Sequence, residues 1–351
     1  MRIYFFIITF TAFSFLIKGQ NNIEIHSESI DSLFSWFDSK CPENRIRSLL
    51  AIPSNQIMEQ LLLKQEKEAS SFSDILSRFS IKCSLAGNDY LLEDAFKNRQ
   101  EISAVLTELK DVEIYKQTFD YVKAFFPAGF TSSARFNIYL TTTGWKWGDA
   151  MTFNYVKEGG KYLLSEKGAS AIIFNLTIMN SNYGKTVEEQ IITYRKVLSH
   201  ELFHAILEEY IVDKDYYNRD QIESEVIFLL MNEGVAHYIA DQKYIANNYD
   251  TLKEKEVLSF SSFSEKAAII FDRNNDMEIR KTVLEDGLYG KYWSKYICIS
   301  GMFMAYHIDK YGGPDLLREC IENGPHFFIE KYREICNTND SLPLLPNIIN
   351  E

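Results

Sequence analysis

The sequence predicts an α+β fold that is mostly helical and contains one small mixed β-sheet. Apolar residues recur at the spacing of amphipathic helices from residue 21 to residue 127. Short alternating stretches rich in Thr and aromatic residues follow Gly129 and predict strands. Neither Pro nor Gly occurs between Thr186 and Glu233, where long helices are expected. Together these observations favour helical layers around a small sheet.

The first 19 residues have the pattern of a secretory signal peptide. Met1-Arg2 gives a positive start, Ile3–Ile17 is apolar, and Lys18-Gly19-Gln20 ends the run. Cleavage near Gly19 or Gln20 is expected, which predicts a secreted or periplasmic protein. An uncleaved membrane anchor is the alternative, although the run is short for a span of about 20 residues. No Cys ends the run, so lipid attachment there has no support, and no stable membrane span is expected after cleavage.

Residues 20–128 are predicted to form an N-terminal helical region. Its apolar stripes at helical spacing fall in 30–37, 57–62, 72–79, 102–109 and 112–122, before a stop at Pro127. We interpret the Phe and Leu of these stripes as core, because no catalytic constellation accompanies them.

Residues 129–340 are predicted to form the catalytic domain, followed by an extended tail over 341–351. The expected strands are Ala134–Thr143, Met151–Val156 and Ala169–Thr177, separated by turns at 144–149 and Gly159-Gly160.

The helix expected after Thr186 carries the pattern His-Glu-x-x-His. Thr186 and Glu189 form a capping box that starts the helix. His200 and His204 are four residues apart, so they share one helix face and can hold one Zn²⁺. Glu201 lies beside the metal, where it can act as the base for a zinc-activated water. A core helix whose histidines bond to backbone is the alternative, but three ionisable groups in an apolar run need partners or a metal.

A catalytic zinc site usually has three protein ligands and a water, so a third ligand is expected. The pattern HExxHxxGxxH is excluded, because Leu207 and Tyr210 occupy its Gly and His places. Glu233 lies on the apolar stripe of a second helix over 221–243, and a zinc ion would compensate its buried charge. Gly234 would permit close approach of a neighbouring backbone. Glu225 and His237 remain as reserve ligands.

These two motifs, His200-Glu201-x-x-His204 and Asn232-Glu233-Gly234-Val235-Ala236-His237, resemble those of the gluzincin group of zinc metallopeptidases. Within that group, the sequence is most similar to poorly characterised secreted bacterial zinc-dependent peptidase families. The resemblance covers roughly residues 130–335. It implies a zincin-like fold, with both motif helices below the sheet and Ala171–Thr177 as the edge strand that aligns substrate.

The sequence departs from this group in one place. Some relatives carry an Asp one turn after the glutamate ligand, where His237 stands here, so the group that orients a ligand histidine is unassigned. Glu208 is a possible substitute.

Related peptidases also use a Tyr at the start of a downstream helix to stabilise the oxyanion. By this resemblance Tyr296 is the first candidate and Tyr292 the second, ahead of His307 and His326.

Composition limits the partners. The chain has 351 residues, 46% of them hydrophobic, and a net charge of −12, with no basic cluster that would favour nucleic acid. The five cysteines form no CxxC pair, so one or two disulfides are possible and at least one thiol must remain: Cys41, Cys83, Cys298, Cys320 and Cys336.

The sequence therefore predicts a secreted zinc metallopeptidase that acts on a peptide or protein substrate. Its predicted metal ligands are His200, His204 and Glu233, with Glu201 as base and Tyr296 as oxyanion donor. Two alternatives remain: a non-catalytic binding or structural protein stabilised by zinc, and a zinc hydrolase of a non-peptide amide.

Overall fold

The structure is a computed structural model and describes residues 23–65, 69–83, 90–132, 135–144, 148–165, 168–216, 218 and 220–347. The predicted signal peptide, Trp145–Trp147 of the predicted turn and the last four residues of the predicted tail lie outside the described residues. No helix among the described residues is long and apolar enough to cross a membrane.

The α+β class is confirmed, and the described elements follow the chain in this order: β1 Ile23–His26, α1 Glu28–Asp38, η1 Glu43–Arg45, α2 Ile46–Leu50, α3 Pro53–Gln65, α4 Phe72–Lys82, α5 Leu92–Lys97, α6 Arg99–Leu109, α7 Val112–Lys123, β2 Phe136–Thr141, β3 Ala150–Glu158, β4 Lys161–Leu164, β5 Ala169–Asn175, α8 Leu176–Asn182, α9 Val187–Tyr210, α10 Ile222–Phe271, α11 Met277–Asp286, η2 Tyr292–Ser294, α12 Tyr296–Asn323 and α13 Pro325–Thr338.

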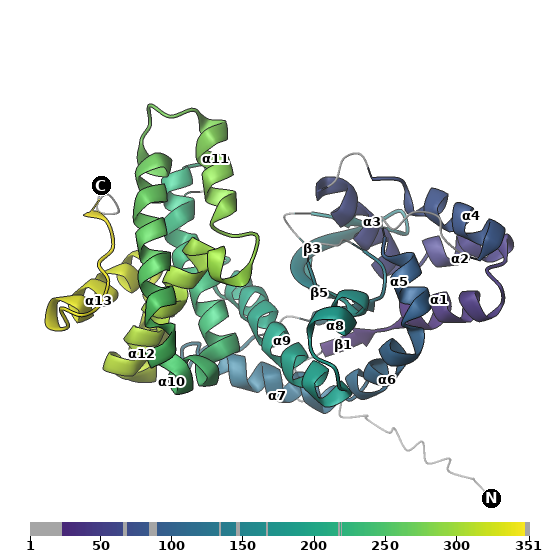
Figure 1. The fold of residues 1–351 in the computed structure, drawn as a ribbon, viewed down its shortest axis with the longest axis horizontal. Helices are drawn as coiled ribbons and strands as arrows, with labels where there is room; N and C mark the ends of the chain where they lie inside the picture. The colour runs from purple at the N-terminus through teal and green to yellow at the C-terminus, as the bar shows by residue number, and fades with distance from the viewer. Residues whose placement is uncertain are drawn as a thin grey trace, which may run out of the picture.

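These elements are arranged in two lobes with α9 between them (Figure 1). One lobe contains the sheet and helices α1–α6, and the other contains α10–α13. Helix α9 contacts β3 and β5 on one side and α10 on the other, so it links the two lobes. The predicted capping box is present at its start, where the Thr186 hydroxyl accepts from the Glu189 N–H and the Glu189 carboxylate accepts from the Thr186 N–H.

The five strands form one mixed sheet in the order β1-β2-β5-β3-β4. The pairs β1–β2 and β2–β5 are parallel, whereas β3 pairs antiparallel with both β5 and β4. The prediction that Ala171–Thr177 is an edge strand is wrong, because β5 lies in the interior of the sheet between β2 and β3. Alternation of apolar and polar residues in the sequence indicates a strand. It does not indicate which strands lie beside it in the sheet, because long-range packing sets that order.

The sheet separates two apolar cores, because successive side chains of a strand point to opposite faces. Ile138 and Ile172 belong to the core shared with α7, α9 and the C-terminal helices, whereas Tyr139 and Ile173 belong to a core shared with α1–α4. Strand β1, from the region predicted to be helical, pairs with β2 and so ties that region into the sheet.

Helices α10 and α12 cross with their backbones in contact. A Cβ on Gly234 would lie 2.4 Å from the Gly301 carbonyl carbon, and a Cβ on Gly301 would lie 2.0 Å from the Leu230 carbonyl oxygen. The close backbone approach expected at Gly234 is therefore confirmed.

We expect Gly301→Ala to lower the free energy of unfolding by roughly 2–3 kcal/mol or more, at the upper end of overpacking costs, because the obstructing atoms are backbone. Denaturant unfolding measures this change. Gly129→Ala is the control, since a Cβ at Gly129 meets nothing within 4 Å. Equal stability of the two variants would contradict the close crossing.

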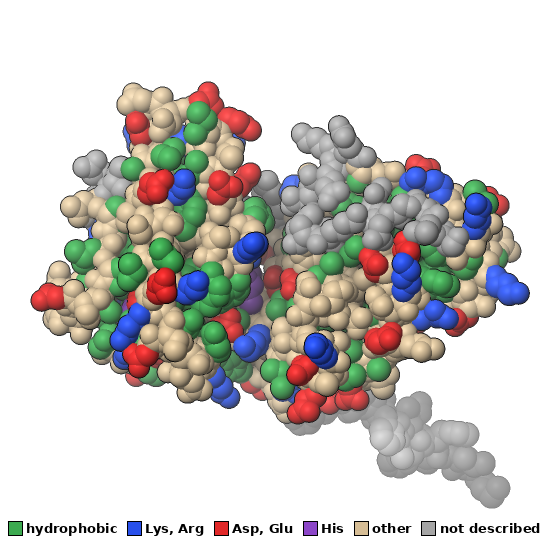
Figure 2. Space-filling view, viewed as in Figure 1, with side chains coloured by type: hydrophobic (Ala, Val, Ile, Leu, Met, Phe, Trp, Pro, Cys, Tyr) green, Lys and Arg blue, Asp and Glu red, His purple; other side chains and the backbone are tan. Residues whose placement is uncertain are grey.

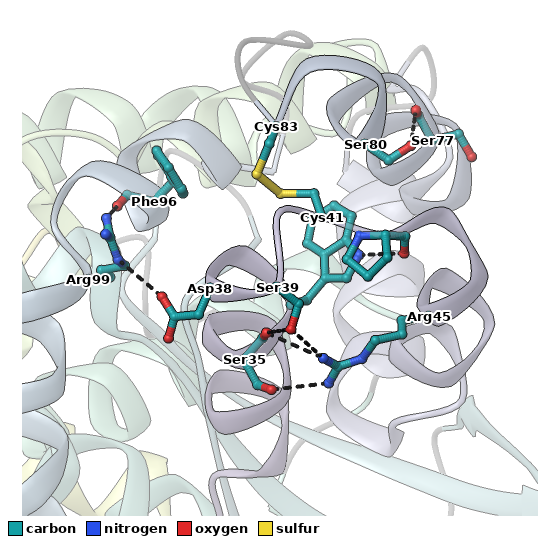
Figure 3. Close-up of a disulfide and its surroundings, with 12 residues drawn as sticks. Ser35, Asp38, Ser39, Cys41, Arg45, Ser77, Ser80, Cys83, Phe96 and Arg99 are labelled. Carbon is teal, nitrogen blue, oxygen red and sulfur yellow. Dashed lines mark hydrogen bonds and ion pairs between the residues drawn. A yellow bond between two sulfur atoms is a disulfide. The ribbon is translucent and has the colours of Figure 1, made fainter.

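One disulfide joins Cys41, just after α1, to Cys83, the residue that ends α4. Arg45 binds the end of α1 beside it through the Ser35 carbonyl and the Ser39 hydroxyl (Figure 3). The remaining cysteines, Cys298, Cys320 and Cys336, are buried free thiols. The disulfide links α1 to α4 within the lobe that contains the sheet.

Candidate metal centre

Three predicted ligand residues meet between the lobes, two from α9 and one from α10. The His200 Nε2 atom lies 3.0 Å from the His204 Nε2 atom. The Glu233 carboxylate lies 3.6 Å from the first nitrogen and 3.5 Å from the second. Figure 2 shows a groove between the lobes with a histidine at its floor.

The distances fit a single zinc ion. Ligands at about 2.0–2.2 Å from a tetrahedral zinc ion lie roughly 3.4 Å from one another. The three donor atoms all lie within 4.8 Å of one another. Their side chains are 16%, 13% and 24% exposed for His200, His204 and Glu233, so a solvent path to the site remains.

Partners on α10 lie beside both rings. His204 Nδ1 lies 2.8 Å from the Asn232 side-chain oxygen. Burial lowers the pKa of His200 well below its usual value, and the Ala236 backbone opposes this lowering. The Asn232 oxygen at His204 Nδ1 keeps the proton there, so the lone pair of His204 Nε2 faces His200 Nε2 and Glu233. Such a convergence of lone pairs and a carboxylate is unfavourable unless a cation lies among them.

Asn232 was not singled out by sequence reasoning, because its role follows from the crossing of α9 and α10. We expect Asn232→Leu to weaken zinc affinity roughly 10–100-fold, the usual cost of removing such a partner. Competition with a chromogenic chelator measures this. Asn232→Asp is the control, since it keeps an acceptor for His204, and equal affinities of the two variants would contradict the role.

Glu201 lies on the side of α9 that faces the sheet. The Thr152 hydroxyl on β3 donates to the Glu201 carboxylate at 2.8 Å and approaches the Glu201 carbonyl at 3.0 Å. Burial raises the pKa of Glu201 to about 7, with the nearby carboxylates of Glu233 and Asp149 adding to the rise and His204 and Thr152 opposing it. The carboxylate is thus held by one hydrogen bond and is poised to gain a proton.

This pKa gives a prediction for the metal-free protein. Because the folded pKa of about 7 exceeds the ordinary 4.5, the contribution of Glu201 to stability is fully present below about pH 4.5 and is lost as pH rises through 7. Relative to Glu201→Gln, the metal-free wild type should lose roughly 2–3 kcal/mol between about pH 5 and pH 8. Urea unfolding across this range measures the difference, and a difference that does not change with pH would contradict it.

The hydroxyls of the two tyrosines predicted as oxyanion donors bond to other groups. The Tyr296 hydroxyl donates to the Val283 carbonyl on α11, so the structure does not bring it to the metal centre. The Tyr292 hydroxyl donates to Asp241 at 2.7 Å.

Among the remaining alternatives, His237 lies beside a proposed ligand, with its ring centre 4.6 Å from that of His200. His307 is fully buried against Glu256, and His326 is exposed on α13. Glu208 accepts from Asn154 and does not replace Asn232 as a partner of the ligand histidines. Glu225 belongs to neither described group of possible metal ligands, whereas His237 belongs to one.

The arrangement defines a candidate zinc centre of the His-Glu-x-x-His type with a glutamate from a second helix. A family model described as "Putative zinc dependent peptidase (DUF5700)" matches residues 46–341. The chain belongs to this family, and zinc is its metal cofactor. The match covers most of the predicted N-terminal helical region and the whole of the predicted catalytic domain. No curated protein and no solved structure matches the chain.

Proposed function

We propose that the protein is a secreted zinc metallopeptidase in which His200, His204 and Glu233 hold the metal. One observation carries the proposal: two Nε2 atoms and a carboxylate converge within 3.6 Å in a largely buried site. The family description supports zinc and peptide hydrolysis. Zinc at such a site lowers the pKa of a coordinated water and polarises a carbonyl group.

Glu201 is the general base of the proposed reaction. Thr152 holds one carboxylate oxygen, which leaves the second to take a proton from the attacking water and later give it to the leaving amine. The same burial that raises the pKa of Glu201 favours this return of the proton. A bound cation opposes that rise, so the working pKa lies below the metal-free value.

The N-terminal half of β3 is the proposed site for the substrate backbone. Strand β4 pairs only with Tyr155–Glu158, so among the described residues Ala150–Phe153 has β5 on one side and no paired strand on the other. Thr152 links this free edge to Glu201. An extended peptide that paired with this edge would pass the base and the metal ligands.

Two groups near the metal centre are proposed as oxyanion donors in place of Tyr296. Tyr289 is exposed. Partial burial and then the Glu233 carboxylate raise its pKa, so the phenol lies within electrostatic range of that ligand. Burial lowers the pKa of both His200 and His237, and the charge of Lys295 adds to this lowering, so its ammonium group lies within electrostatic range of the centre. A hydrogen bond or positive charge there would stabilise the developing negative oxygen.

We infer that the protein is exported. The Cys41–Cys83 disulfide supports an oxidising compartment, in keeping with the signal-like residues 1–19.

Cleavage of peptides by the mature, zinc-loaded protein tests the proposal. A mixture of unstructured peptides is incubated with the protein and analysed by mass spectrometry, with and without a chelator. Chelator-sensitive cleavage that zinc restores is the expected result. A folded protein that holds zinc but cleaves no peptide would contradict the peptidase assignment and favour a structural zinc or a non-peptide substrate.

A further inference from the structure

A second group of metal-ligating side chains lies directly beside the three proposed ligands. Glu233, His237 and Cys298 place one ligand atom each within 4.8 Å of one another. The Cys298 Sγ atom lies 4.0 Å from Glu233 Oε2, and the His237 ring centre lies 4.6 Å from that of His200. His237 and Cys298 are buried. The proposed catalysis uses neither of them.

The helices explain why this group forms. Glu233 and His237 are four residues apart on α10, so they share one face of the helix. Cys298 lies one turn before Gly301 on α12, and the close contact of Gly301 with Gly234 brings that turn against Glu233. The crossing that positions Glu233 for α9 therefore also presents the thiol and the second imidazole to it.

We propose that Glu233, His237 and Cys298 form a second metal subsite that takes a soft or borderline divalent ion such as Zn²⁺ or Cd²⁺. This subsite rests on the proposed function in one respect, because its ligand Glu233 is also a ligand of the proposed catalytic zinc. Thiolate, imidazole and carboxylate ligands are the set that zinc and cadmium prefer over magnesium or calcium. Three protein ligands leave one position open in tetrahedral coordination.

Sharing Glu233 makes the two ions dependent on each other. Either the two oxygens of the carboxylate bridge the ions, as in metal pairs about 3.5–4 Å apart, or the second ion draws the carboxylate away from the first. Because a thiol binds as thiolate, the second ion must displace a proton from Cys298. We therefore expect the subsite of Glu233, His237 and Cys298 to fill after the site of His200, His204 and Glu233.

Cadmium titration of the metal-free protein tests the subsite, because cadmium–thiolate coordination has an ultraviolet charge-transfer absorption that imidazole and carboxylate ligands lack. The disulfide is left intact. The wild type should bind two ions per chain, and the absorption should appear only with the second. Cys298→Ser and Cys298→Ala should bind one ion without the absorption. Cys320→Ser is the matched control for a buried free thiol outside the group and should behave as wild type.

The outcomes separate this subsite from the proposed catalytic site. One ion without the absorption in the wild type, lost in His204→Ala, would overturn the subsite and leave the catalytic zinc site standing. Absorption that persists in both Cys298 variants would also overturn it. Absorption that survives in His204→Ala and is lost in His237→Ala would support the subsite independently of the catalytic zinc.

Discussion

Replacing Glu201 with Gln should lower kcat/KM for peptide hydrolysis by roughly 10²–10⁴-fold, the usual contribution of a positioned general base, while the protein keeps its zinc. Gln has the shape of Glu and can still accept the Thr152 hydrogen bond, so the fold and the metal centre should persist. It cannot take a proton from water. The loss should therefore appear in turnover and not in metal content, which steady-state kinetics and elemental analysis measure together.

The control for this variant is Glu208→Gln on the same helix. Glu208 bonds to Asn154 at an exposed position, so its neutralisation should change kcat/KM little. If Glu201→Gln cleaves peptides as fast as wild type, Glu201 is not the base. If it loses zinc instead, its role is to hold the metal centre together rather than to move a proton.

Many of the helices and the longer strands could be predicted from the sequence, because their signals are local. The helical stripes of 30–37 and 102–109 correspond to α1 and α6, and the capping box at Thr186 marks the start of α9. The four-residue strands β1 and β4 were missed, since so few residues carry little periodicity. The position of β5 inside the sheet depends on partners from distant parts of the chain, which no local pattern encodes.

The candidate site divides in the same way. His200 and His204 share a face because helix geometry requires it, and Glu233 was found because a carboxylate on an apolar stripe needs compensation. Asn232 and Thr152 take their roles from where α10 and β3 pass α9. Asn232 stands in the second motif, but its bond to His204 depends on the helix crossing, and nothing in the local sequence of Thr152 indicates its role. The family resemblance favours Tyr296 because it starts α12, but its hydroxyl donates to the Val283 carbonyl on α11.

Replacing Glu233 with Ala should weaken zinc binding by roughly 10³-fold, about one ligand's share of the 10–16 kcal/mol typical of a zinc site. The two histidines would remain 3.0 Å apart at their Nε2 atoms, but the negative charge that balances the ion would be gone. Glu225→Ala is the matched control, because it removes a half-buried carboxylate from the same helix outside both described groups of possible ligands. It should bind zinc as wild type.

Elemental analysis of the dialysed proteins measures the zinc content of both variants, and circular dichroism establishes that they are folded. One to two zinc ions per chain in wild type and Glu225→Ala, and little in a folded Glu233→Ala, would support the ligand set. Zinc retained in Glu233→Ala would remove Glu233 from that set and point to His237, whose ring already lies against His200. Zinc lost from Glu225→Ala alone would place the metal elsewhere on α10, because that carboxylate belongs to neither described group of possible ligands.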